Sequence, residues 1–282
     1  VDHAKANGIP QFFMFGEVYD ASPDVLSIYT GEGKMQSVLD FGFQDAIHKT
    51  LVKQQGTNVF KALFDQDYKY NDEDSHANRL LNFVGNHDMG RMAFMLNTSE
   101  HGYSEAEKIK RVLLGHALMY FARGIPVVYY GDEQGFVGDG NDQGSRQNMM
   151  PSKVASYNDD DLLATDKTTA DDNFDPEHLF YRSFAQYADV YFTHQALRHG
   201  EQALIHTQST PGLLAFTRTL GQEKFLIVAN TSASAINETV SVSANASLVF
   251  AENSNAHQAN KVADTLALQL PALSFAIYQL TE

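Results

Sequence analysis

The sequence predicts an α/β domain built on a parallel sheet, followed by a small all-β antiparallel sandwich. In the first part of the chain, short and almost continuously apolar runs alternate with segments of helical periodicity. That alternation is typical of βαβ units whose strands are covered on both faces. After Gly200 the pattern changes to short β-rich segments separated by Gly, Asn and Ser, which is typical of an antiparallel sandwich. We therefore expect two domains, residues 1–200 and residues 201–282.

Four apolar runs are the expected strands of the parallel sheet. The first, residues 12–15, follows a short helix that ends at Gly8 and leads through Gly16 into Glu17. The other three are residues 35–43, 79–88 and 124–133. Because the runs do not alternate with polar residues, we expect all four strands to be buried on both faces.

Helical periodicity predicts helices over residues 43–56, 104–124 and 176–200, each closed by a glycine. The second opens with Ser104 and, three residues on, Glu107, which is the pattern of a capping box. The strands expected in the sandwich are residues 212–220, 224–232, 238–244, 246–252 and 273–280.

The charge of the chain excludes one class of partner. The net charge is −15, whereas nucleic-acid binding needs clustered Lys and Arg, so we expect no nucleic-acid partner. Residues 158–177 alone carry eight acids and one lysine, a net charge of −7. We interpret this run as a solvated loop. Calcium binding is the alternative, although the oxygens do not follow the spacing of an EF-hand.

The chain has no cysteine and no apolar stretch long enough to span a membrane, so we expect neither a disulfide framework nor a membrane partner. These features fit a cytosolic, periplasmic or secreted protein equally well. Val1 is an unusual natural start, so we expect the chain to have lost its own beginning.

Three of the four apolar runs end in carboxylates. Glu17 ends the first, Asp88 ends the third within Asn-His-Asp, and Asp132 and Glu133 end the fourth. Parallel α/β folds gather their chemistry at the carboxyl ends of the strands, where an apolar floor raises the pKa of a carboxyl group. Glycoside hydrolysis needs such paired carboxylates. Caps, loop acids, and enolase-like or metal-dependent barrels give the same pattern, so these alternatives remain open.

Several motifs together resemble the α-amylase family, glycoside hydrolase family 13. They are "FFMFGEV", "SVLDF", "FVGNHD" with "NHDMGR", "GIPVVYYGDEQGF", "SRQNM" and "ALRHGEQ", in that order along essentially the whole chain. The resemblance implies that the four strands are strands five to eight of an eight-stranded TIM barrel, followed by the family's C-terminal β-sandwich. The combination is specific, whereas a lone "NHD" would be a weak signal.

The resemblance also implies roles for single residues. Glu17 matches the family's general acid/base, and Asp88 matches the aspartate that stabilises the transition state. His87 matches a histidine that hydrogen-bonds the sugar hydroxyls, and Arg91 matches a position that often touches the next sugar. Since the chain has no Trp, exposed tyrosines such as Tyr19 would supply ring stacking on sugars. The Gly-Asp-Glu at residues 131–133 is read mainly as structural.

The sequence departs from the family pattern in one decisive respect. The family's nucleophilic aspartate lies in a motif resembling G-F-R-x-D, and neither this motif nor D-x-x-x-N-H occurs in the chain. The chain is therefore identified as a C-terminal α-amylase fragment that carries the acid/base but lacks the nucleophile, and we expect it to be inactive alone. We expect no required cofactor and assign no metal ligand; the parent enzyme would hold structural Ca²⁺ through residues absent here.

The expected partners follow from the same resemblance. They are an α-glucan oligosaccharide and either the missing N-terminal half of the barrel or a second copy, joined through the strand edges "QFFMF" and "PVVYY". Alternatives for the parent are a glucan transglycosidase, a glucosyl isomerase or a non-catalytic scaffold. The sandwich could also act as a carbohydrate-binding piece. By resemblance, a secreted or periplasmic location is favoured.

Overall fold

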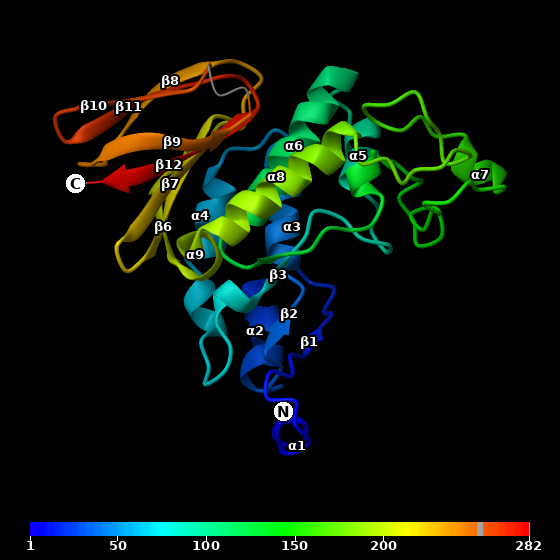
Figure 1. Cartoon of the computed structure of the whole chain (residues 1–282), viewed down its shortest axis with the longest axis horizontal. Coiled ribbons are helices and arrows are strands. Elements are labelled where there is room, and N and C mark those ends of the chain that lie inside the picture. The colour runs from blue at the N-terminus through cyan, green and yellow to red at the C-terminus, as the bar shows by residue number, and fades with distance from the viewer. Residues whose placement is uncertain (253–255, 282) are drawn as a thin grey trace.

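A computed structural model describes residues 1–252 and 256–281 (Figure 1). Four parallel strands lie side by side in chain order: β1 (Phe15–Gly16), β2 (Ser37–Val38), β3 (Leu81–Asn82) and β4 (Ile125–Pro126). β1 pairs with β2 and β3 pairs with β4, and a parallel bridge between Leu39 and Leu81 joins the two pairs. The predicted α/β class with a parallel sheet is confirmed.

The strands are much shorter than the apolar runs that predict them, because each run turns into a helix or loop within a few residues. After β2, the side chain of Asp40 accepts a hydrogen bond of 2.9 Å from the backbone N–H of Phe43 and so begins helix α3 (Phe41–Ile47). After β4, the chain enters a 3₁₀ helix, Asp132–Gln134.

The expected burial on both faces is wrong for the first strand and for the fourth, whose residues 125–129 are only half-buried. Phe12, Phe13 and Phe15 are 40, 41 and 52 % exposed, and Glu17 is exposed as well. β1 pairs only with β2, and no other described element pairs with its second edge. A continuous apolar run predicts that both faces of a strand are covered. In the described part of this chain, the phenylalanine side chains of the run stay exposed and β1 is paired along one edge only.

Helices lie beside the parallel strands and between them and the sandwich (Figure 1). Besides α3 they are α1 (Asp2–Ala6), α2 (Pro23–Gly31), a π-helix (His48–Val52), α4 (Asn58–Phe64), 3₁₀ turns at Asp67–Tyr70 and Ala77–Arg79, α5 (Met92–Asn97), α6 (Glu105–Phe121), α7 (Ala155–Asn158), α8 (Leu179–Thr193) and α9 (Gln195–His199). Among the described residues, no helix is long and apolar enough to cross a membrane.

The helix predictions were right in position and partly wrong in extent. The capping box of α6 is present, with Ser104 and Glu107 each bonded to the other's backbone N–H. α6 ends at Phe121 rather than at Gly124, whose φ of +112° lies outside the helical region. The expected helix over residues 176–200 is divided into α8 and α9 at His194, which has extended dihedrals.

The last part of the chain is an antiparallel sandwich. Its strands are β5 (Glu201–His206), β6 (Leu213–Leu220), β7 (Glu223–Asn230), β8 (Ile236–Val240), β9 (Asn245–Ala251), β10 (Gln258–Val262), β11 (Thr265–Leu270) and β12 (Ser274–Thr281). They form one sheet in the order β5-β6-β7-β12-β9 and a second in the order β10-β11-β8. All five predicted segments are strands, whereas β5, β10 and β11 were not anticipated.

The two parts share a core. Phe121 at the end of α6 and Tyr187 on α8 meet Phe275 of β12, with ring centroids 5.8 and 5.4 Å apart. All three rings are at most 1 % exposed. The helices that cover the parallel strands are therefore packed on their other side against the sandwich.

Candidate active site

The structure brings Glu17 together with the Asn-His-Asp segment at the carboxyl ends of the strands. Glu17 directly follows β1, and residues 86–88 lie a few positions after β3. The Nδ2 of Asn86 donates to Glu17 Oε1 over 3.4 Å. Two segments almost seventy residues apart thus meet at one edge of the sheet, as parallel strands require.

Residues 86–90, here called the NHD turn, are held by their own hydrogen bonds. Asn86 and Gly90 exchange backbone bonds of 3.2 and 3.1 Å. The Oδ1 of Asn86 accepts from the backbone N–H groups of Asp88 and Met89, both at 3.0 Å. Gly90 has φ +92°, and a Cβ there would lie 2.7 Å from Gly140 Cα. The turn is therefore fixed before any ligand arrives.

The turn presents His87 and Asp88 as neighbours on the surface. His87 Nε2 lies 3.2 Å from Asp88 Oδ1, and their side chains are 35 and 40 % exposed. Arg146 Nη2 lies 3.7 Å from the same Asp88 oxygen and also pairs with Asp142 four residues earlier. The side chains of His87 and Asp88 are thus both accessible to a ligand, and Asp88 lies near the positively charged guanidinium of Arg146.

Arg146 is a candidate site residue that the sequence analysis did not single out. It lies in "SRQNM", a segment used there only as part of the family resemblance. The spacing of Asp142 and Arg146 indicates a local ion pair, but only the folded chain shows that the guanidinium also faces Asp88.

Arg91, the fourth expected site residue, lies beneath the turn rather than on its surface. Its side chain is 0 % exposed. Nη1 donates to Asp132 Oδ1 and to the carbonyl oxygen of Tyr130, both at 2.7 Å. The guanidinium also lies 4.5 Å from the centre of the Tyr129 ring. Arg91 therefore anchors the loop after β4, and its donors face protein groups.

Tyr19 is separate from this network and open to solvent. It is 67 % exposed, and its ring packs 4.9 Å from that of Phe41.

Behind the turn, Tyr129 donates to the carbonyl oxygen of Ser145 over 3.0 Å, and burial raises the pKa of Tyr129 to about 12. Burial also raises the pKa of Glu133, which accepts a 2.8 Å bond from the N–H of Gly131.

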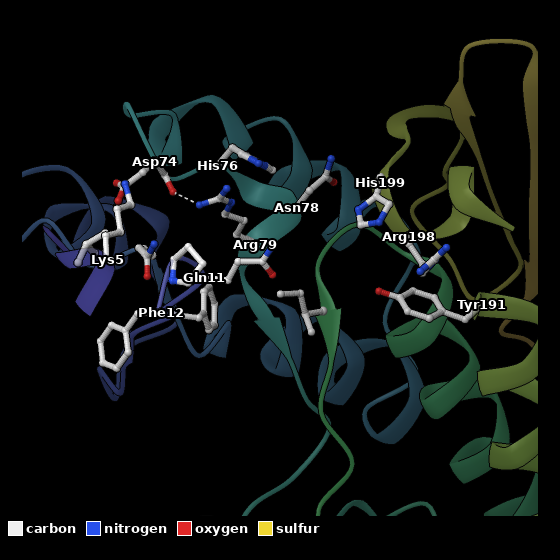
Figure 2. A pocket seen from close by; sticks show the side chains of 15 residues that line it. Lys5, Gln11, Phe12, Asp74, His76, Asn78, Arg79, Tyr191, Arg198 and His199 are labelled. Atoms are coloured by element: carbon white, nitrogen blue, oxygen red, sulfur yellow. Dashed lines mark hydrogen bonds between the residues drawn. The ribbon is translucent and has the colours of Figure 1, made fainter. Parts of the chain in front are cut away.

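A wide cavity lies at the opposite end of the strands. It has a volume of about 700 Å³ and is lined by residues that precede or begin the strands, among them Gln11, Phe12 and Arg79 (Figure 2). Tyr191 and His199 close its other side. None of the residues that we expect at the active site lines this cavity.

In the described part of the chain, no three His, Asp or Glu side chains are grouped so that they could hold a metal ion. In the acidic run, Lys167 pairs with Asp175 over 3.3 Å, and Thr168 bonds Asp171. These are the local contacts of a polar loop.

The sequence matches known families over nearly its whole length. The family described as "Alpha amylase, catalytic domain" matches residues 1–190, and "Maltogenic Amylase, C-terminal domain" matches residues 203–277. The chain belongs to the α-amylase family of glycoside hydrolases. The resemblance inferred from the sequence motifs is thereby confirmed.

Individual relatives agree with this assignment. An α-amylase of Streptomyces lividans is 40 % identical over 217 residues, which is 77 % of this chain and 24 % of the relative. A cyclomaltodextrin glucanotransferase of Klebsiella oxytoca is 32 % identical over 149 residues, 47 % of this chain and 23 % of the relative. The chain thus spans about a quarter of each of these two proteins.

Solved structures share the fold. An Anoxybacillus α-amylase superimposes with a TM-score of 0.74 at 20 % identity, covering 99 % of this chain and 55 % of that one. An α-amylase of Geobacillus thermoleovorans, solved in complex with acarbose, gives 0.71 at 19 % identity and covers 100 % of this chain and 56 % of that one. The described fold is therefore that of part of an α-amylase.

Proposed function

We propose that this chain carries the acid/base side of the active site of an α-amylase that hydrolyses α-1,4-glucans with retention of configuration. One observation carries the proposal: Glu17 and the NHD turn, which come from different strands, meet at one edge of the sheet through Asn86. An oligosaccharide ligand is supported by the acarbose complex of the Geobacillus relative. Tyr19 would offer that ligand an exposed ring.

In this mechanism Glu17 protonates the glycosidic oxygen as the bond to the anomeric carbon breaks. Asn86 occupies one of its carboxyl oxygens, and the exposed side chain leaves the other free for the leaving group. Asp88 and His87 would hold the hydroxyls of the distorted sugar. After the first step, Glu17 takes a proton from the water that releases the glycosyl group.

The nucleophile that forms the covalent intermediate must come from outside this chain. The sequence contains no motif resembling G-F-R-x-D, and the open edge of β1 offers a place for a further strand. We therefore propose that the chain alone does not hydrolyse starch and works with the preceding half of an α-amylase barrel. Structural Ca²⁺ in the complete enzyme would be held by that preceding half.

Complementation tests this proposal. The chain is mixed with the part of the S. lividans catalytic domain that precedes the region matching it, and hydrolysis of a maltooligosaccharide is followed by reducing ends. We expect activity from the mixture and none from either part alone. Glu17→Gln should lower the rate by about 10²- to 10⁴-fold, the usual contribution of a general acid. Glu177→Gln, in the acidic loop, is the matched control and should leave it unchanged.

Two results would contradict the proposal: hydrolysis by the pure chain alone, or a mixture whose rate does not depend on Glu17.

A glucan transglycosidase remains the second candidate, because the relatives include cyclomaltodextrin glucanotransferases. Product analysis separates the two activities, since transfer yields cyclic or elongated glucans and hydrolysis yields short linear ones.

A further inference from the structure

We propose that His116, Asp132 and Arg91 form a buried positioning network that fixes the orientation of the NHD turn. That this orientation matters for catalysis rests on the proposed function. The presence of the network does not. Arg91, Asp132 and His116 are 0, 5 and 1 % exposed, so their charges and hydrogen bonds are shielded from water.

Arg91 is the end of the network that touches the turn. It directly follows Gly90, the last residue of the turn, and is the N-cap residue of α5. Its guanidinium donates to Asp132 and to the Tyr130 carbonyl, and further to the carbonyl oxygen of Ser145 at 3.2 Å and to Gln147 Oε1 at 3.3 Å. The guanidinium of Arg91 is planar, and its bonds to four acceptors allow it only one orientation. The backbone at residue 91 is therefore held in place.

Asp132 is the centre of the network. Its Oδ1 accepts from Arg91, and its Oδ2 lies 3.5 Å from His116 Nε2. The preceding Gly131 has φ +89°, and a Cβ there would lie 2.6 Å from the Phe136 ring and 3.2 Å from Arg91 Nη2. Glycine is therefore required for Asp132 and Arg91 to approach each other.

His116 closes the network from α6. Its Nδ1 lies 2.8 Å from the carbonyl oxygen of Val112, which can only accept, so Nδ1 carries a hydrogen. The ring stacks on Phe184 with centroids 4.2 Å apart and an angle of 24°. Nε2 then faces Asp132 Oδ2, and two bare lone pairs would repel each other. The proposed network therefore includes a hydrogen shared between these two atoms.

The network therefore connects α6, which carries His116, to the NHD turn. Nε2 of His116 and Oδ2 of Asp132 face each other over 3.5 Å, and neither atom meets another hydrogen-bond partner among the described residues. Removing His116 would take away the ring nitrogen that faces Asp132 Oδ2, so we expect Asp132 and with it Arg91 to shift. The shift would reach His87 and Asp88 through the backbone of Arg91.

NMR spectroscopy of the full chain, labelled with ¹⁵N at its histidines, tests this network without any sugar. In the wild-type chain we expect a proton at or shared with His116 Nε2 that exchanges slowly with water. A bare Nε2, with the proton on Nδ1 alone, would overturn the proposal. Because this measurement needs no variant, it does not depend on whether a variant folds.

Variants then test positioning against a merely structural role. His116→Phe retains the stack on Phe184 and removes both ring nitrogens, so we expect shifted ring signals of His87 and about tenfold or faster amide exchange at Asp88 and Met89. His116→Gln, which can still donate to Asp132, should restore both readouts toward wild type. The matched control is His257→Phe, another buried histidine, which contacts Ser274 Oγ in the sandwich over 3.1 Å.

Unchanged His87 signals and exchange rates in a folded His116→Phe chain would overturn the proposal. The same changes in His257→Phe would overturn it as well, because they would reflect general loosening. None of these readouts uses hydrolysis, so failure of the network and failure of the proposed function are separate results.

Discussion

The sandwich and the parallel strands differ in how much of their apolar surface is buried within the described chain. The sandwich strands are five to eight residues long, and its two sheets bury their facing sides in a common apolar core. The parallel strands are two residues long, and the first presents exposed phenylalanines beside an unpaired edge. The difference teaches that the sandwich strands bury most of their apolar surface within the described chain, whereas the first parallel strand leaves apolar surface and one edge exposed.

Two buried arginines show the same contrast. Arg123, between α6 and β4, donates to Asp40 Oδ2 at 2.6 Å and to both oxygens of Asp67, and these carboxylates hold its pKa above the ordinary value. Arg218 of β6 has one bond, to the carbonyl oxygen of Phe121 at 3.3 Å, and burial lowers its pKa to about 10. Arg123, beside the parallel strands, is thus paired with carboxylates, whereas Arg218 of the sandwich has no carboxylate partner among the described residues.

The largest effect is expected at Arg123. Arg123→Met should lower the free energy of unfolding by about 3–5 kcal/mol, because Asp40 is left buried without its partner. Chemical denaturation of the variant and of wild type measures this change.

Arg218→Met is the matched control for Arg123. It removes a buried charge that has no carboxylate partner among the described residues, so we expect a change of less than about 1 kcal/mol or a gain. Equal losses in the two variants would remove the distinction between the two regions.

A second prediction concerns the open edge. Light scattering at micromolar concentration should show that the chain self-associates, because Phe12 and Phe13 are exposed beside an unpaired strand. Phe13→Ser should shift the distribution toward monomer, while Phe192→Ser, at a more exposed phenylalanine on α8, should not. A stable wild-type monomer would show that this edge needs no partner.

The smallest effect is expected in the acidic loop. Burial, followed by repulsion from Asp139 and Asp159, raises the pKa of Asp160 to about 6. A raised pKa means that the folded chain favours the protonated form, so the stability from this group is present below about pH 4 and lost as the pH rises through 6.

Asp160→Asn should therefore raise the melting temperature at pH 7 and leave it unchanged near pH 4. The exposed Asp166→Asn serves as the control in the same loop. A gain that is equal at both pH values would show that repulsion at Asp160 is not its cause.

Much of this architecture could be predicted from local signals. Strand runs, the capping box at Ser104 and the carboxylates at strand ends all depend on residues close together in sequence. The short helices α2, α4 and α5 were missed, since their apolar residues show weak periodicity over one or two turns.

The rest depends on contacts between distant segments. The motif around residue 91 places an arginine near the site, but its burial is decided by acceptors at residues 130–147. The meeting of Arg146 with Asp88 is likewise set by the loop after β4. The exposure of β1 could not be read from its composition, because an apolar run is the same whether or not its cover is present.

One measurement tests most directly that this chain holds the acid/base and not the nucleophile. The complemented mixture is treated with a fluorinated α-glucosyl fluoride, which slows release of the covalent intermediate, and the labelled peptide is found by mass spectrometry. We predict that the sugar is attached to an aspartate of the preceding segment and that Glu17 and Asp88 are unlabelled. A glycosyl group on either of these two residues would contradict the account.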